Sequence, residues 1–155
     1  MMKPIQVGLL GIGTVGSGVF TVLARNQEEI KRRAGRGIRI HTAEVVDDAR
    51  KVIQNPEIDI VVELIGGYGI AKDLVLEAIA AGKHVVTANK ALIAVHGNEI
   101  FKAAHAKGVM VAFEAAVAGG IPIIKALREG LSANRIEWIA GIINGTTNFI
   151  LSEMR

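Results

Sequence analysis

The stretch VGLLGIGTVGSG, residues 7–18, decides the fold. It continues an apolar run that predicts a short buried strand over residues 5–10, and it leads into a helical pattern. Between the two is a GxGxxG turn, in which Gly11 permits the tight turn, Gly13 leaves room for a pyrophosphate, and Gly16 lets the helix pack closely on the strand. The free N–H groups at the start of such a helix favour phosphate. The strand before and the helix after favour a dinucleotide site over a glycine turn with only a structural role.

The composition is that of a globular protein without a nucleic-acid partner. The 155 residues are 50% hydrophobic and 21% charged, which suits one domain, or one domain and the start of another, with a sizeable core. The net charge is only +3, and the densest basic group, within residues 31–39, lies where a helix ends, so we interpret it as a solvated face. Aromatic residues make up 4%, too few for a base-stacking surface.

Cysteine usage and apolar runs bear on the compartment. Cysteine is absent, which excludes disulfides, thiolate metal sites and a cysteine nucleophile. The N-terminus lacks the charged and apolar regions of a signal peptide, and no apolar run reaches a membrane-spanning length. We therefore expect a cytoplasmic protein with no membrane partner.

Strand and helix patterns alternate along the chain. We expect strands at residues 5–10, 38–46, 58–65, 84–87 and 109–116, and helices at residues 14–33, 47–53, 70–81 and 98–107. Asn26 is a candidate interruption of the first helix, and Asp47-Asp48 is the cap of the second. This order predicts an α/β fold, a doubly wound, mainly parallel, Rossmann-like sheet.

The pattern changes after residue 116, so we divide the chain into a dinucleotide-binding domain, residues 1–116, and the beginning of a second α+β domain, residues 117–155. The second part is expected to hold a helix from Pro122 to about residue 131, a strand at 135–143 and a final helix at 148–155. Because this helix stops without a cap, we expect an incomplete domain. Its apolar side chains predict self-association as a dimer; they are Trp138, Ile142, Phe149 and Ile150.

Four loops rich in small residues leave the carboxyl ends of the predicted strands, where ligands bind in such sheets. They are Gly11–Gly16, Gly66–Tyr68, Ala88–Lys90 and Ala115–Gly120. Taken singly, each is also explained by turn formation; together they predict a binding cleft. Lys90 follows the strand HVVT within three residues, so its ammonium is a candidate to hold a substrate oxygen, assist proton transfer or bind cofactor, against the alternative of a solvated loop lysine.

Two glutamates stand within apolar strands. Glu63 is either a functional acid or a structural anchor for backbone N–H groups. Glu114 precedes a small, irregular segment, residues 115–121, whose carbonyl oxygens are candidates to converge on a hard monovalent cation. The four histidines lack the paired spacing of a zinc site, and no GxSxG nucleophile motif is present.

Five motifs together resemble homoserine dehydrogenase: GIGTVGSGV, VVELIGG, VVTANKALIA, FEAAVAGGIPII and GIINGTTNFIL. They occur in the family's order and cover nearly the whole chain. The resemblance implies NAD(P)-dependent interconversion of L-homoserine and L-aspartate 4-semialdehyde, in the pathway from aspartate to threonine, methionine and isoleucine. It also implies that the second domain is the start of a catalytic and dimerisation domain.

The resemblance assigns roles motif by motif. The cofactor pyrophosphate would be held by Gly11, Ile12, Gly13, Thr14, Val15 and Gly16. Thr87 and Lys90 would lie near the nicotinamide, with Lys90 one of two active-site lysines. A sodium ion would be bound by backbone oxygens of Glu114, Val117, Gly119 and Ile121. The substrate pocket would be lined by Asn144, Gly145 and Thr146.

The chain departs from the family in two ways. Relatives carry a longer segment between the second strand and the next helix, where NAD or NADP is normally selected. Here Asp47 favours NAD through a ribose 2′-OH, whereas Arg50 or Lys51 favours NADP through a 2′-phosphate; the resemblance favours NADP. Relatives also continue beyond residue 155 with the second active-site lysine, substrate-binding acids and most of the dimerisation sheet. Two rivals therefore stay open: a cofactor-binding module without turnover, and another amino-acid or aldehyde dehydrogenase.

Overall fold

Five parallel strands form a single sheet in the order β2-β1-β3-β4-β5. The computed structural model describes residues 2–41, 45–141 and 145–154. The strands are β1 (Ile5–Leu10), β2 (Ile38–Ile40), β3 (Ile60–Glu63), β4 (His84–Thr87) and β5 (Val111–Ala112). The expected α/β fold with a doubly wound, Rossmann-like sheet is confirmed.

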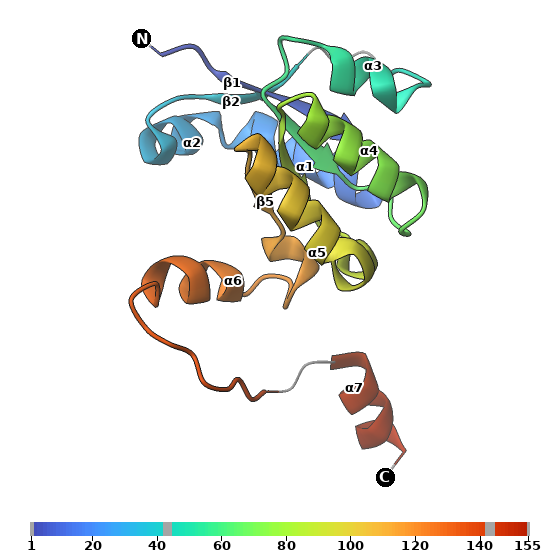
Figure 1. Cartoon of the computed structure of the whole chain (residues 1–155), viewed down its shortest axis with the longest axis vertical. Helices are drawn as coiled ribbons and strands as arrows, with labels where there is room; N and C mark the ends of the chain where they lie inside the picture. Colours follow the sequence, from blue (N-terminus) through green and yellow to red (C-terminus); the bar gives the residue numbers. More distant parts are fainter. Residues whose placement is uncertain (1, 42–44, 142–144, 155) are drawn as a thin grey trace.

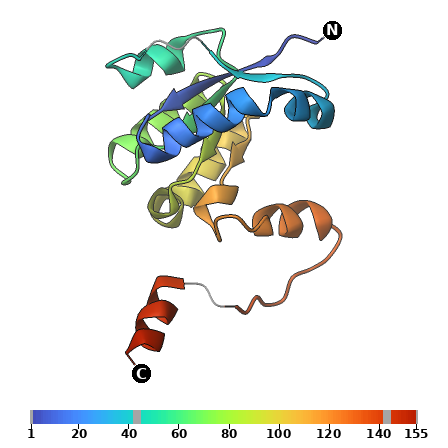
Figure 2. The same ribbon diagram turned by 180° about the vertical axis from the view of Figure 1, so that it is seen from behind.

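The helices cover the two faces of the sheet unequally (Figures 1 and 2). The helices are α1 (Thr14–Arg25), α2 (Gln27–Ala34), α3 (Ala49–Gln54), α4 (Ile70–Ala80) and α5 (Lys90–Lys107). From β1 to β2 the chain moves one way across the sheet, and in every later step it moves the other way. Because such crossovers are right-handed, α1 and α2 lie on one face and α3, α4 and α5 on the other.

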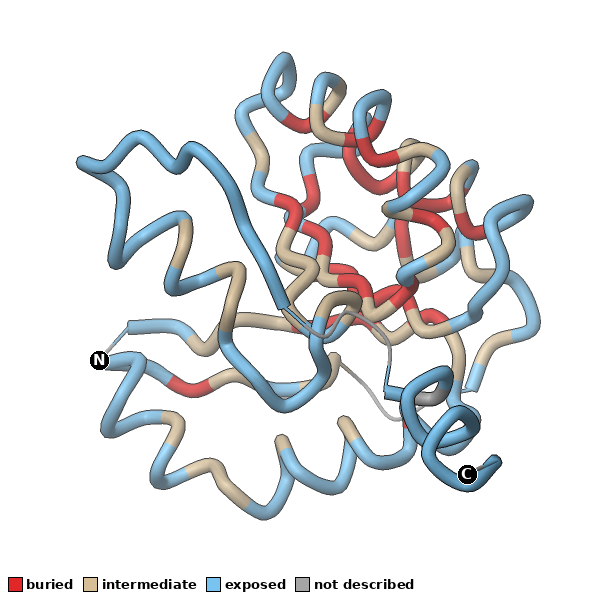
Figure 3. The backbone as a smooth tube through the Cα atoms, turned by 90° about the horizontal axis from the view of Figure 1, so that it is seen from below, coloured by how far each residue is buried: buried red, intermediate tan, exposed pale blue. Residues whose placement is uncertain are grey.

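The apolar core lies between the sheet and the helices α4 and α5. Buried segments gather on that side of the molecule in Figure 3. The cluster includes Val61 and Val85 from the sheet, Val75 and Ile79 from α4, and Ile100 from α5. On the opposite face only Gly16 is buried among the residues of α1 and α2. That face therefore keeps open space beside α1.

Helix ends follow local chemistry that the sequence displays. The predicted interruption at Asn26 separates α1 from α2, and the Gln27 amide nitrogen donates to the carbonyl of Ile38 at 2.6 Å, which ties α2 to β2. The helices α2, α4 and α5 are each followed by a glycine with positive φ: Gly35 at 73°, Gly82 at 77° and Gly108 at 72°.

Several predicted boundaries were wrong. The helix α5 begins at Lys90 rather than at residue 98, because the Asn89 side chain caps it by accepting from Leu92 N at 3.1 Å. The strand β2 ends at Ile40, and although residues 42–44 lie outside the described ranges, Val45 and Val46 are not in a strand. The strand β5 holds two residues, and Glu114–Ala116 form the 3₁₀ turn η1 instead of extending it.

The C-terminal part stands apart from the sheet (Figures 1 and 2). The expected helix after Pro122 forms as α6 (Ile123–Lys125) and continues as the π-helical turns η2 (Ala126–Gly130). The expected strand at 135–143 is wrong over residues 135–141, which pair with no described strand; residues 142 and 143 lie outside the described ranges. The last helix, α7, spans Gly145–Glu153. None of the helices in the described ranges is both long and apolar enough to cross a membrane.

Candidate nucleotide-binding site

The GxGxxG turn lies at the point where the order of the strands reverses. The chain passes from β1 to its neighbour β2 and then returns to β3 on the other side of β1. In open α/β sheets, ligands bind at such a point, outside the carboxyl ends of the strands. The turn between β1 and α1 is therefore where an α/β sheet of this order receives a ligand.

The three glycines of the motif differ in what a side chain would meet. A Cβ on Gly16 would lie 2.1 Å from the carbonyl oxygen of Gly11, and one on Gly11, where φ is 99°, would lie 2.9 Å from Leu64 O. Around Gly13, by contrast, a Cβ would meet nothing within 4 Å. Two glycines are thus required by the packing of the turn. The open space beside Gly13 has no such explanation and fits the close approach of a ligand.

The start of α1 is suited to an anion. Gly13 is its N-cap residue and supplies no side-chain hydrogen bond, and no acidic residue stands in the first turn. The first N–H groups of a helix point outward and carry partial positive charge. Ile12 and Val15 are exposed here, so a bound pyrophosphate would also cover apolar surface. The turn thus fits the phosphate group expected from the motif.

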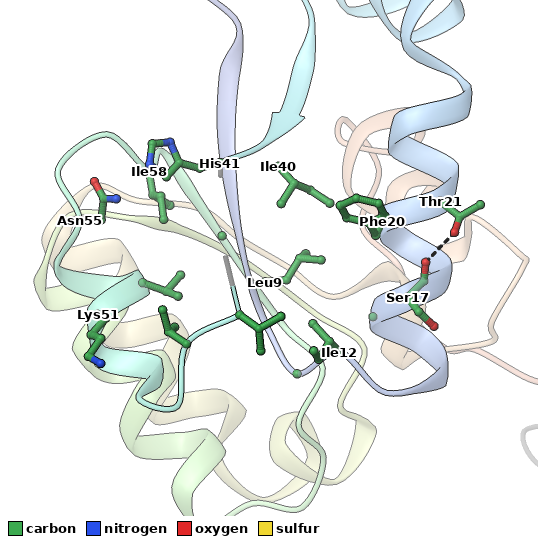
Figure 4. Close-up of a pocket in the computed structure, with 16 residues that line it drawn as sticks. Leu9, Ile12, Ser17, Phe20, Thr21, Ile40, His41, Lys51, Asn55 and Ile58 are labelled. Carbon is green, nitrogen blue, oxygen red and sulfur yellow. Dashed lines mark hydrogen bonds between the residues drawn. The ribbon is translucent and has the colours of Figure 1, made fainter. Parts of the chain in front are cut away.

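A cavity of about 700 Å³ extends from this turn towards the end of β2 (Figure 4). Phe20 and Ser17 of α1 line one side, and Lys51 of α3 with Asn55 lines the other. Its walls are mainly apolar, with the remaining lining made by Gly8, Leu9, Gly11, Ile12, Gly16, Thr21, Ile40, His41, Val45, Val46, Val52 and Ile58. Apolar walls with a few polar groups suit a flat heterocycle such as adenine.

Two ion pairs lie on α3. The Lys51 ammonium, at the cavity, is 2.9 Å from Asp47 Oδ1, and this hydrogen bond lowers the pKa of Asp47. The Arg50 guanidinium instead reaches Glu77 on α4, with Nη2 2.8 Å from Oε1 and Nε 2.9 Å from Oε2. Hydrogen bonding to Glu77 raises the pKa of Arg50. Of the two candidate cations, only Lys51 lines the cavity.

Thr87 and Lys90 lie at the carboxyl end of β4, and they differ in how far their side chains are exposed. Thr87 is buried, and its hydroxyl donates to Glu63 Oε2 at 2.6 Å while accepting from Asn89 N at 3.0 Å. Its proton is therefore not available to a ligand. Lys90 is exposed at the first position of α5. Glu63 accepts from Ile65 N and Gly66 N at 2.8 and 3.1 Å, as the structural-anchor hypothesis predicted.

The segment with the candidate cation ligands is irregular. Ala118 has φ of 48° and Gly120 of 84°, so the carbonyls of this segment point in varied directions. The carboxylate of Glu114 accepts from Ile124 N and Lys125 N, both at 2.9 Å, and so holds the start of α6. The backbone oxygen of Glu114 accepts from Val117 N at 3.3 Å. The other three candidate ligands, Val117, Gly119 and Ile121, follow within this segment.

The candidate substrate residues in the described ranges lie on α7. Gly145 is the first residue of α7 and Thr146 the second, and Asn144 lies outside the described ranges. This helix stands away from the carboxyl ends of the strands (Figure 1). The described residues therefore bring the glycine turn and the cavity together at the sheet, and Gly145 and Thr146 do not join them.

Two family models match the chain. The model described as "Homoserine dehydrogenase, NAD binding domain" covers residues 11–114, and the one described as "Homoserine dehydrogenase" covers residues 122–155. The chain belongs to the homoserine dehydrogenase family.

Individual homoserine dehydrogenases are similar over nearly the whole chain. The relative from Pseudomonas aeruginosa is 66% identical over 168 residues, which cover 99% of the chain and 39% of that protein. The one from Neisseria gonorrhoeae is 59% identical with the same coverage. The chain thus spans about 39% of the length of these curated relatives. Since 168 aligned residues exceed the 155 of this chain, the Pseudomonas relative carries residues within this span that the chain lacks.

Solved homoserine dehydrogenases share the fold. The crystal structure from Thiobacillus denitrificans has a TM-score of 0.90 at 66% identity, covering 98% of this chain and 39% of that one. A hyperthermophilic archaeal homoserine dehydrogenase in complex with NADPH has a TM-score of 0.78 at 25% identity, covering 98% of this chain and 56% of that one.

Sequence reasoning missed part of the candidate site. It named the glycine turn and Lys90, but not the apolar cavity walls, such as Phe20 and Ile40, because a motif does not show which apolar residues stay uncovered. It also missed Asn89 as the cap of α5, although Asn before a run of helix-forming residues is a recognisable signal.

Proposed function

We propose that this chain binds NAD(P) and forms the nucleotide-binding part of an enzyme that interconverts L-homoserine and L-aspartate 4-semialdehyde. The observation that carries the proposal is the uncapped N-terminus of α1 at the reversal of strand order, with open space beside Gly13. The pyrophosphate would lie on residues 11–16, and the adenosine would enter the cavity beside them. Membership of the homoserine dehydrogenase family supports the substrate and the pathway to threonine, methionine and isoleucine.

The bound nicotinamide would accept or deliver the hydride, and the protein would orient the reacting groups. Lys90 is proposed to hold the substrate oxygen, because it is exposed at the carboxyl end of β4. Gly145, Thr146 and Asn144 are proposed to contact substrate once α7 approaches the sheet. The backbone oxygens of Glu114, Val117, Gly119 and Ile121 are proposed to bind sodium. Stabilisation by sodium chloride over choline chloride at equal ionic strength would support this site, and equal melting temperatures would contradict it.

The test of cofactor binding is Gly13→Val. A branched side chain there fills the space proposed for the pyrophosphate, yet it meets no protein atom within 4 Å of its Cβ. We expect affinity for reduced cofactor to fall by about 10- to 100-fold, as loss of charge-assisted hydrogen bonds implies. The measurement is fluorescence titration with NADH and with NADPH. Gly18→Val is the matched control, because Gly18 is also unhindered and lies on α1 outside the motif. Equal binding by wild type and Gly13→Val would refute the assignment.

We also propose that the chain works in the cytoplasm as a homodimer, with the division between domains near residue 116. The gap between the two family matches, residues 11–114 and 122–155, supports that division. The exposed Trp138, Phe149 and Ile150 support association; Ile142 lies outside the described ranges. Sedimentation that shows only monomer at high concentration would contradict the dimer, and recovery of the protein outside the soluble cell fraction would contradict the location.

A further inference from the structure

The buried carboxylate of Glu63 is the charged group that the proposed function leaves unused. Glu63 ends β3 and is 0% exposed. Within the described ranges it forms no ion pair. Instead, Oε1 accepts from the N–H groups of Ile65 and Gly66, and Oε2 accepts from the hydroxyl of Thr87. A carboxylate without these bonds would be strongly unfavourable in such a place. The loop after β3 and the end of β4 are therefore held by one group.

The hydrogen bonds continue from Thr87 into a closed ring. Thr87 Oγ1 accepts from the backbone N–H of Asn89 at 3.0 Å. The side-chain Nδ2 of Asn89 donates to the carbonyl of Gly67, which returns the ring to the loop after β3. The side-chain Oδ1 of Asn89 accepts from Leu92 N and so caps the start of α5. Because Thr87 has one proton and gives it to Glu63, the direction of these bonds is fixed.

The ring lies beneath the surface that would receive the nicotinamide end of a dinucleotide. Leu64 N donates to Leu10 O at 2.8 Å, so the loop after β3 also lies against the end of β1. Gly66 and Gly67 have φ of 83° and 69° and open space around them, which leaves their backbone accessible. Lys90 follows Asn89 directly. Three strand ends and the candidate catalytic lysine are thus held in one arrangement.

We propose that Glu63 is a positioning residue that, through Thr87 and Asn89, fixes the loops after β3 and β4 in the arrangement that receives the nicotinamide. The inference rests on the proposed cofactor function. Thr87 acts in it through its buried hydroxyl rather than by contact with the cofactor. The side chains of the ring do not line the cavity proposed for the adenosine, which lies beside α1 on the other side of β1.

The test compares a cofactor that carries the nicotinamide with one that lacks it. We expect Glu63→Gln, Thr87→Val and Asn89→Ser each to weaken binding of NADH by about tenfold, the effect of losing one hydrogen bond to a charged or buried group. Binding of ADP-ribose, measured by calorimetry, should stay within about twofold, since one lost ring contact does not reach the adenosine side. If the wild type prefers NADP, the same comparison is made with NADPH in place of NADH and with 2′-phospho-ADP-ribose in place of ADP-ribose. Asn89→Ser is the mild variant, because serine still caps a helix but does not reach Gly67.

Two further variants separate positioning from stability. Thr87→Ser keeps the hydroxyl and should restore NADH binding. Ile79→Val removes a methylene-sized group from the core of α4, far from the ring, and should lower the melting temperature while affecting both ligands equally. If the ring variants lost affinity for NADH and for ADP-ribose equally, or lost affinity for neither, the positioning role would be overturned. A wild type that binds neither ligand would overturn the proposed cofactor function itself.

Discussion

Arg50 and Lys51 are neighbours on α3, but only one is positioned to recognise a ribose 2′-phosphate. Arg50 forms three hydrogen bonds with Glu77, at 2.8 to 3.2 Å, and does not line the cavity. Lys51 lines the cavity and pairs with Asp47, which is 89% exposed. An exposed ion pair contributes little, so a phosphate can take the place of Asp47.

We therefore expect Lys51→Ala to weaken NADPH binding by about tenfold and to leave NADH binding within about twofold, because only NADPH carries the 2′-phosphate. Parallel fluorescence titrations with the two cofactors measure this. Arg50→Ala is the matched control and should leave the ratio of the two affinities unchanged. If the ratio of NADPH to NADH affinity changed in Arg50→Ala and not in Lys51→Ala, the assignment to Lys51 would be wrong and Arg50 would be the residue that selects the cofactor.

At the scale of single residues, the sequence predicts positions fixed by backbone conformation, such as the glycines of the turn, better than it predicts the partners of side chains. Gly11 and Gly16 were identified because a GxGxxG turn leaves few alternatives at those positions, and the structure has a close backbone contact at each. Glu63 stayed ambiguous between functional acid and anchor. Its partners Ile65, Gly66 and Thr87 come from a loop and another strand, and the pairing of β3 with β4 that brings Thr87 near is a tertiary fact.

At the scale of elements, α3 is short and depends on its cap. It has six residues, and the Asp48 side chain accepts from Arg50 N at 2.9 Å. A helix of this length is not stable by itself, so loss of its cap lowers the stability of the protein. We expect Asp48→Ala to lower the free energy of unfolding by about 1 kcal/mol and the melting temperature by roughly 2–4 °C. Thermal unfolding followed by circular dichroism measures it. Asp48→Asn keeps the capping oxygen and should stay near wild type; equal losses in both variants would point away from capping.

Elements were predicted well where a local signal marks both ends and poorly where the ends depend on pairing. The strands β1 and β4 were predicted to the residue, each between clear turn signals. The strand β5 was predicted as eight residues and has two, because its pairing with β4 ends at Ala112. Residues 135–141 read as a strand, but a strand needs a partner, and none of the described strands pairs with them.

At the scale of the whole molecule, the glycine turn and the cavity lie at the sheet, whereas Gly145 and Thr146, the candidate substrate residues in the described ranges, belong to α7. The turn, the cavity and the ring around Glu63 all belong to the sheet and its helices. The C-terminal part leaves Trp138 77% and Phe149 66% exposed, and α7 lies apart from the carboxyl ends of the strands (Figure 2). We therefore predict that binding of cofactor and turnover of substrate are separable in these 155 residues.

We expect these 155 residues to bind cofactor but to turn over homoserine very slowly. Oxidation of an alcohol requires removal of the hydroxyl proton as the hydride leaves, and a positioned general base contributes about 10²–10⁴-fold. Lys90 begins α5 at the carboxyl end of β4, and one ammonium does not both orient the oxygen and accept its proton. The family resemblance implies that relatives carry a second lysine and the acids that grip the substrate outside the part that this chain matches, and loss of positioning costs further orders of magnitude.

The measurement is kcat/KM with homoserine and each cofactor, for the 155 residues and for a version extended to the length of the Pseudomonas relative. We expect the extended protein to exceed the shorter one by at least about 10²-fold, while both bind reduced cofactor with similar affinity. The extended protein with Lys90→Met serves as the matched control, because it retains the added residues and loses the proposed contact to the substrate oxygen. Comparable kcat/KM values for the short and extended proteins would mean that these 155 residues suffice for the reaction, and would contradict the need for groups outside them.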